Sequence, residues 1–175
     1  LMKTRLKSSL KFGDFSILNI PSTKVALMAD SDFPLCSEAL RNYGSLYTEL
    51  SDWFAIFCFI NGLKTLVALL CVNDSYRTEF KSVYPNSLHL SKIEVKKPFR
   101  DSNLKEKLHV FSNSMEFLEY IAKEAGYNYI TLQAIDLLVA PKYKHIGYTN
   151  IDHSKFFKNE QLDFYVVHPF FVKKL

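Results

Sequence analysis

The Asn61-Gly62 pair, set between two apolar runs, is the feature that most constrains the fold of this chain. The runs on either side, residues 53–60 (WFAIFCFI) and 63–72 (LKTLVALLCV), are rich in aromatic, aliphatic and β-branched residues. Asn-Gly readily adopts the positive φ angles that a two-residue hairpin turn requires. The sequence therefore predicts two buried antiparallel strands joined by a tight turn.

Residues 53–72 also have the ~20-residue length of a membrane helix. However, Asn61, Gly62 and Lys64 would then lie near the middle of the bilayer, where a lysine is costly. The N-terminal stretch LMKTRLKSSLKFGDF is basic but lacks the apolar segment of a signal peptide. We therefore predict a cytoplasmic protein that does not bind a membrane.

Composition sets further bounds. The 175 residues suit one domain with a sizeable core, and the net charge of +4 permits an anionic ligand without indicating a nucleic-acid-binding protein. The three cysteines (Cys36, Cys58 and Cys71) have no histidine at ligand spacing. We therefore expect free thiols in a reducing compartment and no metal site.

Hydrophobic periodicity divides most of the chain into strands and helices. Further strands are predicted at 15–20, 24–29, 88–95 and 127–135, with one or two more between 163 and 175. Helices are predicted at 35–50, where Gly44 weakens or splits the helix, and at 136–147, where Pro141 indicates a late start or a kink. The order predicts a single domain over 1–175, of class α/β (α+β), with a mixed and mostly antiparallel sheet flanked by helices. Residues 1–30 are expected to contribute N-terminal strands to this domain.

The longest predicted helix begins at Leu104. Its apolar positions up to Ala125 are three or four residues apart and form one stripe over about six turns. Gly126 is suited to end it. The segment before it, 96–108 (KKPFRDSNLKEKL), is basic and follows the strand at 88–95 directly. Because the first turn of a helix exposes unpaired N–H groups and a partial positive charge, this turn predicts an anion site.

The same segment has a simpler interpretation as a capped helix start on a solvated basic surface. Asp101, Ser102 and Asn103 are all good N-cap residues. An inward-facing Asp101 would repel a diphosphate. The segment contains no glycine, but asparagine is among the few other residue types that tolerate a left-handed conformation, so Asn103 could replace one glycine.

Two windows of the second half resemble the GNAT superfamily of acyl-CoA-dependent N-acyltransferases. Residues 100–105 (RDSNLK) match the arginine of that family's phosphate loop, (Gln/Arg)-x-x-Gly-x-(Gly/Ala), and depart from both glycines. Residues 143–148 (YKHIGY) keep the family's Tyr-x-x-x-Gly-aromatic spacing, and Asp136 lies near the position of a family asparagine. With the order of elements, the resemblance covers about residues 30–175.

The resemblance implies an N-acetyltransferase that binds acetyl-CoA and transfers its acetyl group to an amine by direct attack, through a tetrahedral intermediate. In this family the strand at 88–95 and the strand after it separate, which frees backbone groups for the pantetheine arm. The implied cofactor-binding residues are Ile93, Val95, Arg100, Ser102, Asn103, Leu104, Lys105 and Asp136.

Two residues are candidates for catalysis. Tyr143 resembles the family's general acid, since a phenol can protonate the leaving thiolate, although an aromatic residue here also suits core packing. Glu94, in an otherwise apolar strand, is a candidate acceptor of the amine proton. The alternative for Glu94 is a surface ion pair with Lys92 or Lys96.

Two rival functions stay open. A catalytically inactive GNAT-like fold can serve as a protein-interaction or regulatory module, and a longer acyl chain can replace the acetyl group. The expected partner is a small-molecule or peptide amine and not a nucleic acid. A homodimer is one alternative for the oligomeric state.

Overall fold

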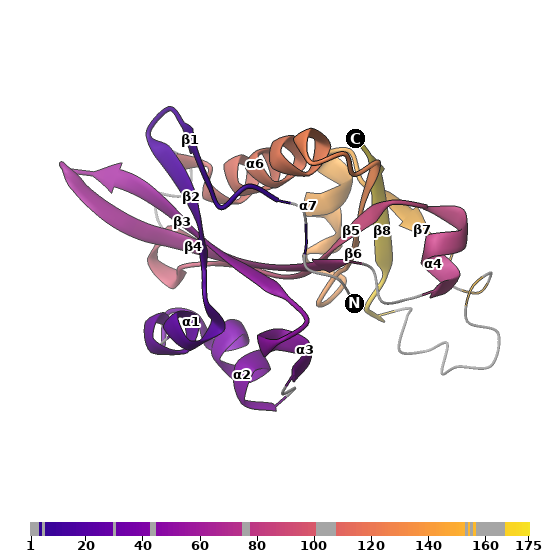
Figure 1. Ribbon diagram of the computed structural model, residues 1–175, viewed down its shortest axis with the longest axis horizontal. Helices are drawn as coiled ribbons and strands as arrows, with labels where there is room; N and C mark the ends of the chain where they lie inside the picture. Colours follow the sequence, from indigo (N-terminus) through magenta and orange to yellow (C-terminus); the bar gives the residue numbers. More distant parts are fainter. Residues whose placement is uncertain are drawn as a thin grey trace.

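The computed structural model (Figure 1) describes residues 4, 6–29, 31–42, 45–74, 78–100, 108–152, 154, 156 and 167–175. Within them, one sheet of eight strands runs in the order β1-β2-β3-β4-β5-β6-β8-β7. All neighbouring strands are antiparallel except β5 and β6, which are parallel. The predicted α+β class and mostly antiparallel sheet are confirmed. The strands are β1 (Ser9–Phe12), β2 (Phe15–Ile20), β3 (Asp52–Ile60), β4 (Leu63–Asp74), β5 (Ser87–Val95), β6 (Tyr129–Gln133), β7 (Thr149–Ile151) and β8 (Phe170–Lys174).

Helices cover both faces of the sheet, with α6 on one side and α1 to α3 on the other (Figure 1). Phe54 belongs to the core beneath α6 and α7, and Trp53, the next residue on β3, to the core beneath α1 and α2. This alternation is expected for a strand buried on both faces. Phe80 of α4 packs against β7 and β8 in a third cluster. The helices are α1 (Ser22–Met28), α2 (Pro34–Asn42), α3 (Ser45–Thr48), α4 (Thr78–Val83), α6 (Val110–Glu124) and α7 (Ala140–His145), with a 3-10 turn at Lys97–Phe99.

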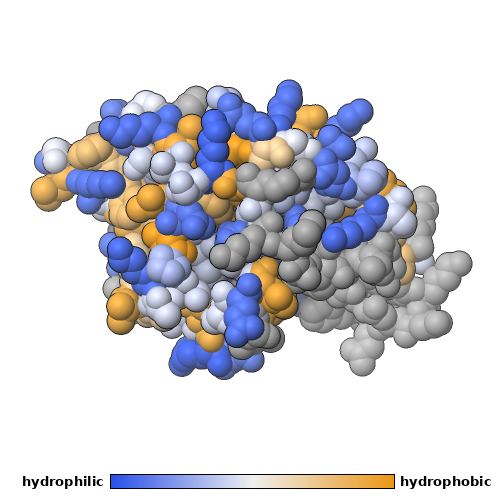
Figure 2. Space-filling view, in the orientation of Figure 1, coloured by the Kyte–Doolittle hydropathy of each residue, from blue (hydrophilic) through white to orange (hydrophobic). Residues whose placement is uncertain are grey.

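The predicted hairpin is confirmed. Asn61 (φ 51°) and Gly62 (φ 78°) form the turn between β3 and β4, both in the left-handed region. Its tip leaves Phe59 and Leu63 exposed, and Figure 2 shows apolar side chains gathered at this end of the molecule. Within the described residues, no helix combines the length and the apolar character needed to cross a bilayer.

Two irregularities expected from the sequence are also confirmed. The helical segment at 35–50 is split, since α2 ends at Asn42 and α3 begins at Ser45. The helix predicted at 136–147 starts late, with Pro141 in the first turn of α7. Proline is tolerated in a first turn because its missing N–H would have no partner there.

The strand predicted at 24–29 is wrong, because this segment forms α1. Pro21 occupies the N-cap, Val25 is the one residue of α1 that is buried, and Leu27 is exposed. A short apolar run does not distinguish a strand from a helical turn by its periodicity. The sequence also did not predict β1, β7 or α4.

The helix predicted from Leu104 is confirmed from Val110 onward, but it is not continuous, and its predicted start lies outside the described residues. It ends as predicted, with Gly126 in a left-handed conformation (φ 89°). However, α6 begins only at Val110, because His109 adopts a left-handed conformation (φ 47°, ψ 48°) that interrupts the stripe. Residues 101–107 lie outside the described part of the chain.

Candidate active site

The parallel strands β5 and β6 separate halfway along β5. Their pairing runs from Ser87 opposite Tyr129 to Leu90 opposite Leu132, whereas β5 continues to Val95. The separation coincides with a β-bulge, an extra residue on one strand of a pair. The register between β4 and β5 passes over Ser91 at this bulge.

A side-chain hydrogen bond supports the bulge. Nδ2 of Asn73, a fully buried residue of β4, donates to Oγ of Ser91 at 2.5 Å. The contact ties the bulged residue to the strand that stays paired. The split between β5 and β6 is therefore built into the sheet.

The unpaired part of β5 turns two sets of backbone groups away from β4. The Lys96 N–H donates to the Val67 carbonyl at 2.8 Å, in register with the rest of the β4–β5 ladder. Because antiparallel residues alternate, Glu94 shares this orientation, and Ile93 and Val95 direct their N–H and C=O groups to the opposite side. That side is where β6 has moved away. The strand separation that the resemblance implied is therefore present.

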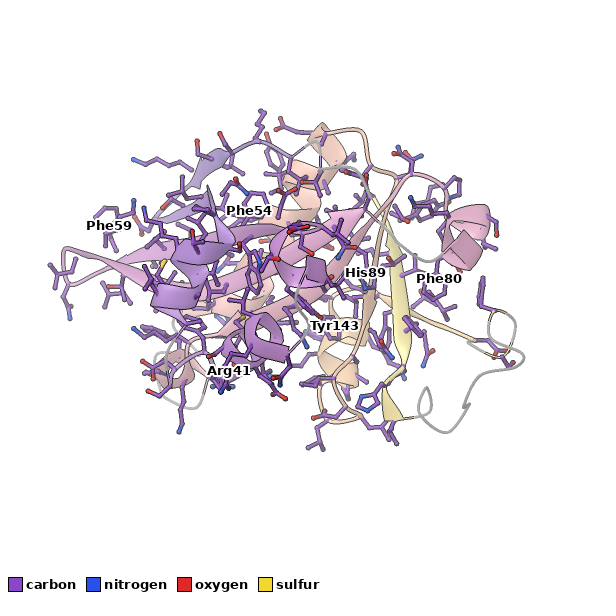
Figure 3. All side chains as sticks on the ribbon, turned by 60° about the horizontal axis from the view of Figure 1, so that its bottom comes forward. Arg41, Phe54, Phe59, Phe80, His89 and Tyr143 are labelled. Carbon is purple, nitrogen blue, oxygen red and sulfur yellow. The ribbon has the colours of Figure 1, made fainter. Side chains whose placement is uncertain are left out.

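A cleft of about 1260 Å³ opens at the separation of β5 and β6. Figure 3 shows His89 of β5 and Tyr143 of α7 near the middle of the molecule, and both line this cleft. The walls come from β5, β6, the start of α6, α7 and the region of α2 and α3. The lining residues are Leu35, Leu46, Tyr47, residues 89–95, Phe99, Arg100, residues 109–112, residues 133–135, Val139, residues 141–143, His145, Ile146 and His168.

The N-terminus of α6 points unpaired N–H groups at this cleft. The first N–H group to find an acceptor in the helix is that of Asn113, which donates to the His109 carbonyl at 2.9 Å. The N–H groups of Val110, Phe111 and Ser112 precede it and have no acceptor within the helix. These three residues line the cleft. The predicted contacts at 102–105 fall outside the described residues, and the unpaired N–H groups of α6 begin at Val110, five residues after position 105.

Basic side chains also line the cleft. Arg100 lines it, and its Nε atom is buried without a hydrogen-bond partner among the described residues. Lys142 and His145 of α7 and His109 also lie on the wall. A buried guanidinium nitrogen without a partner is costly, so the group is suited to an anionic ligand.

Tyr143 is buried and also lines the cleft. The residue is 7% exposed. The centre of its ring lies 5.6 Å from that of Phe111 and 6.0 Å from that of Tyr148, both in edge contacts, and 5.9 Å from that of Phe171. Burial raises the pKa of the Tyr143 hydroxyl well above its ordinary value. The phenol therefore stays protonated and can act as a hydrogen-bond donor. Tyr143 thus belongs to the core and also borders the cleft. Core packing and proton donation, the two roles considered for it, are therefore compatible.

Glu94 occupies a different position from the one expected. It is 3% exposed, and its Oε1 and Oε2 accept the backbone N–H groups of Cys36 (2.9 Å) and Leu35 (3.1 Å). These groups lie in the first turn of α2, so the carboxylate satisfies a helix N-terminus from a neighbouring strand. The predicted surface ion pair of Glu94 with Lys92 or Lys96 is wrong, because Glu94 is buried. Nζ of Lys96 instead lies 3.9 Å from Oδ2 of Asp32.

Asp136 does not line the cleft. Its Oδ1 accepts the N–H groups of Leu138 and Val139 at 2.8 and 3.0 Å, which fixes the loop that leads into α7. Sequence reasoning gave no role to His89, although it lies in the cleft with Nδ1 3.0 Å from Oγ1 of Thr131. That contact joins residues on two strands, and no local pattern could have predicted it.

Comparison with known sequences does not identify a family for this chain. No protein-family model matches the chain. It is 26% identical over 145 residues, 78% of its length, to sulfite reductase (NADPH) subunit beta of Saccharomyces cerevisiae. Because the match spans 10% of that protein, the name of the whole enzyme says nothing of what this chain does.

Comparison of structures is more informative. The C-terminal condensation domain of Ebony, in complex with beta-alanyl-dopamine, matches with a TM-score of 0.58 at 10% identity, over 97% of this chain and 100% of that one. N-acetylglutamate synthase from Neisseria gonorrhoeae, with coenzyme A and N-acetyl-glutamate, matches with 0.55 at 12% identity, over 94% of this chain and 36% of that one. AtaTR bound with AcCoA matches with 0.54 at 8% identity, over 93% and 94%. At these identities the likeness shows the fold alone, and that fold is the one shared by GNAT-type acetyltransferases. The chain has a GNAT-superfamily fold.

Proposed function

We propose that this chain is an N-acyltransferase that takes acetyl-CoA as donor and a small-molecule or peptide amine as acceptor. The observation that carries the proposal is the cleft where β5 leaves β6. It brings the unpaired backbone groups of β5 and the unpaired N–H groups of α6 to one continuous site. An elongated donor with a diphosphate at one end and amides along its arm fits such a site.

The diphosphate end of the donor would sit on the first turn of α6. The N–H groups of Val110 to Ser112 provide donors, and the helix N-terminus favours negative charge. Arg100 and Lys142 on the wall add positive charge. We also propose that the diphosphate contacts four residues before α6, which are Ser102, Asn103, Leu104 and Lys105.

The pantetheine arm would then lie against β5. Ile93 and Val95 direct their backbone groups to the side from which β6 has withdrawn. An extended ligand with amide groups can pair there in the manner of an added strand. This arrangement would carry the thioester from the start of α6 toward Tyr143.

The chemical step needs little more than orientation and proton movement. The neutral amine attacks the thioester carbonyl carbon, so an N–C bond forms and the C–S bond breaks. The amine nitrogen gives up one proton and the thiolate gains one. Tyr143 would donate to the sulfur, and solvent would return the proton to its oxygen.

Glu94 is the proposed acceptor of the amine proton, directly or through a water. Its oxygens accept one N–H group each from α2, the Cys36 thiol also hydrogen-bonds to the carboxylate, and a remaining lone pair is left for a further donor. The carboxylate is also held in a single orientation by these bonds. It therefore acts from a fixed position on the wall of the cleft.

Two narrower points belong to the same proposal. A longer acyl chain is an alternative to the acetyl group, and comparison of acyl-CoA donors tests it. We also propose a cytoplasmic protein that binds neither nucleic acid nor a membrane, for which the net charge of +4 is the support.

The rival is an inactive GNAT-like fold that serves as an interaction module. Exposed apolar side chains at the hairpin tip, Phe59 and Leu63, and in the loop before α7, Leu137 and Leu138, favour it. Turnover of acetyl-CoA with any amine would refute it.

Calorimetric titration with acetyl-CoA tests the proposal. We expect micromolar binding that is retained with desulfo-CoA and weakened by Arg100→Glu. The matched control is Lys24→Glu on α1, an exposed position outside the cleft. Absence of binding at millimolar acetyl-CoA would refute the proposal.

A further inference from the structure

The cleft has a second half, on the face of the sheet that α2 and α3 cover. We call it the acceptor half and define it by Leu35, Leu46, Tyr47, Lys92 and Glu94, which all line the cleft. Lys92 and Glu94 are two residues apart on β5, opposite Cys71 and Leu69 of β4. Both of these β4 residues belong to the core beneath α1 and α2. The two charged side chains therefore lie on the same face.

The positive charge of this half comes from Lys92. Within the described residues, Lys92 takes part in no ion pair and no hydrogen bond, and its Nζ lies 6.0 Å from the centre of the Tyr47 ring. The attraction between an ammonium group and an aromatic ring is weaker than a hydrogen-bonded ion pair, so Lys92 can still bind an anionic group. A ligand carboxylate would supply it.

The negative charge comes from Glu94, and it is already oriented. Its two oxygens accept the N–H groups of Leu35 and Cys36, so the carboxylate faces the N-terminus of α2. The Cys36 thiol hydrogen-bonds to the carboxylate as well, and the remaining lone pair can accept from an ammonium group or a water. This half of the cleft thus offers one cation and one anion on adjacent same-face positions.

We propose that the acceptor is an amino acid, an amine whose own carboxylate binds Lys92 while its nitrogen lies toward Glu94. Same-face positions on a strand are roughly 6.5 Å apart, a separation that a short amino acid with its two charges can bridge. The inference rests on the proposed function, because it names the substrate class of the same cleft. A diamine or polyamine would instead place a positive charge against Lys92.

The test uses amines that differ only in the carboxylate. Glycine, β-alanine, 4-aminobutyrate and glutamate are each compared with the carboxamide counterpart, and spermidine serves as the cationic amine. Two readouts are taken on the intact protein. Thiol release from acetyl-CoA gives kcat/KM, and ligand-observed NMR gives binding of each amine with and without acetyl-CoA.

We expect at least one acid to exceed its amide about tenfold or more in kcat/KM, since a hydrogen bond to a charged group is strong. Lys92→Met should abolish this preference by lowering the value for the acid alone, and Lys92→Arg should retain most of it. Lys64→Met is the matched control. Lys64 lies over the Phe57 ring at 4.8 Å on β4, outside the cleft, and its loss should change neither value.

The outcomes separate the two proposals. If acetyl-CoA binds but amides or spermidine are equal or better acceptors, the amino-acid proposal is overturned while the acyltransferase proposal stands. If acetyl-CoA does not bind, the acyltransferase proposal falls, and the NMR comparison decides the substrate class. Equal binding of acids and amides, or an acid preference that survives Lys92→Met, would overturn the amino-acid proposal in that case too.

Discussion

Ser112 offers a direct test of where the diphosphate binds. It is the third residue of α6, lines the cleft, and its Oγ donates to the His109 carbonyl at 3.2 Å. Ser112→Asp would place a carboxylate on the order of 5 Å from a phosphate seated on the same turn. At an effective dielectric constant of about 20, each pair of unit charges at that distance repels by about 3 kcal/mol. Because the position is half-buried, we expect coenzyme A to bind about 10- to 100-fold more weakly.

The same substitution should leave the fold intact, which keeps the test clean. An acidic residue in the first turn of a helix adds about 0.3–1 kcal/mol of stability. Thermal unfolding of Ser112→Asp should therefore occur at the temperature of the parent protein or slightly above it. Ser112→Asn, a neutral residue of the same size as Asp, is the matched control and should bind coenzyme A nearly as well as the parent.

Calorimetry on the three proteins gives the answer, repeated at high salt, where the effect of the carboxylate should shrink. If Ser112→Asp bound coenzyme A as tightly as the parent, the diphosphate would not lie at the start of α6. The geometric argument for the donor site would then be refuted.

Three further predictions concern buried groups. Tyr143→Phe should reduce kcat by ~100-fold with unchanged coenzyme A affinity, and undiminished turnover would remove the phenol from the mechanism. Glu94→Gln should lower the free energy of unfolding in urea by about 1–3 kcal/mol, because one N–H group at the start of α2 then faces an amide NH₂; a variant of parental stability would contradict the helix-capping role. Burial raises the pKa of the Cys71 thiol to about 12, so the folded state keeps a proton that the unfolded state loses near its ordinary value of 9.0. The free energy of unfolding should be undiminished below pH 9 and fall toward pH 12, by at most ~1.4 kcal/mol per pH unit for this group. If the urea midpoint of Cys71→Ala fell just as steeply with pH, the loss would not come from the Cys71 thiol.

The parts of the fold that the sequence predicted are those that local chemistry decides. Asn61-Gly62 forms the hairpin turn because few other dipeptides accept two positive φ angles. Gly126 ends α6 for a related reason, and Pro141 appears in the first turn of α7, where its missing N–H costs nothing. In each case the residue itself carries the constraint.

The parts that the sequence did not predict depend on distant contacts. Histidine is one of the residue types enriched at positive φ, but it adopts helical angles far more often, so the apolar stripe from Leu104 appeared continuous through His109. The partners of Glu94 lie 58 and 59 residues earlier in the chain, so local charge suggested lysines instead. Lys92 of β5 and Tyr47 of α3 likewise come together in the cleft only when the chain is folded, because 45 residues separate them in the sequence.

The central claim is that the donor lies in the gap between β5 and β6 with its diphosphate on α6. Amide NMR during a titration with acetyl-CoA tests it most directly. The account predicts the largest shifts at the N–H groups of Ile93, Val95, Phe111 and Ser112, and small shifts at Glu94, whose N–H group faces β4. Large shifts confined to other parts of the protein, or none at saturating acetyl-CoA, would contradict it.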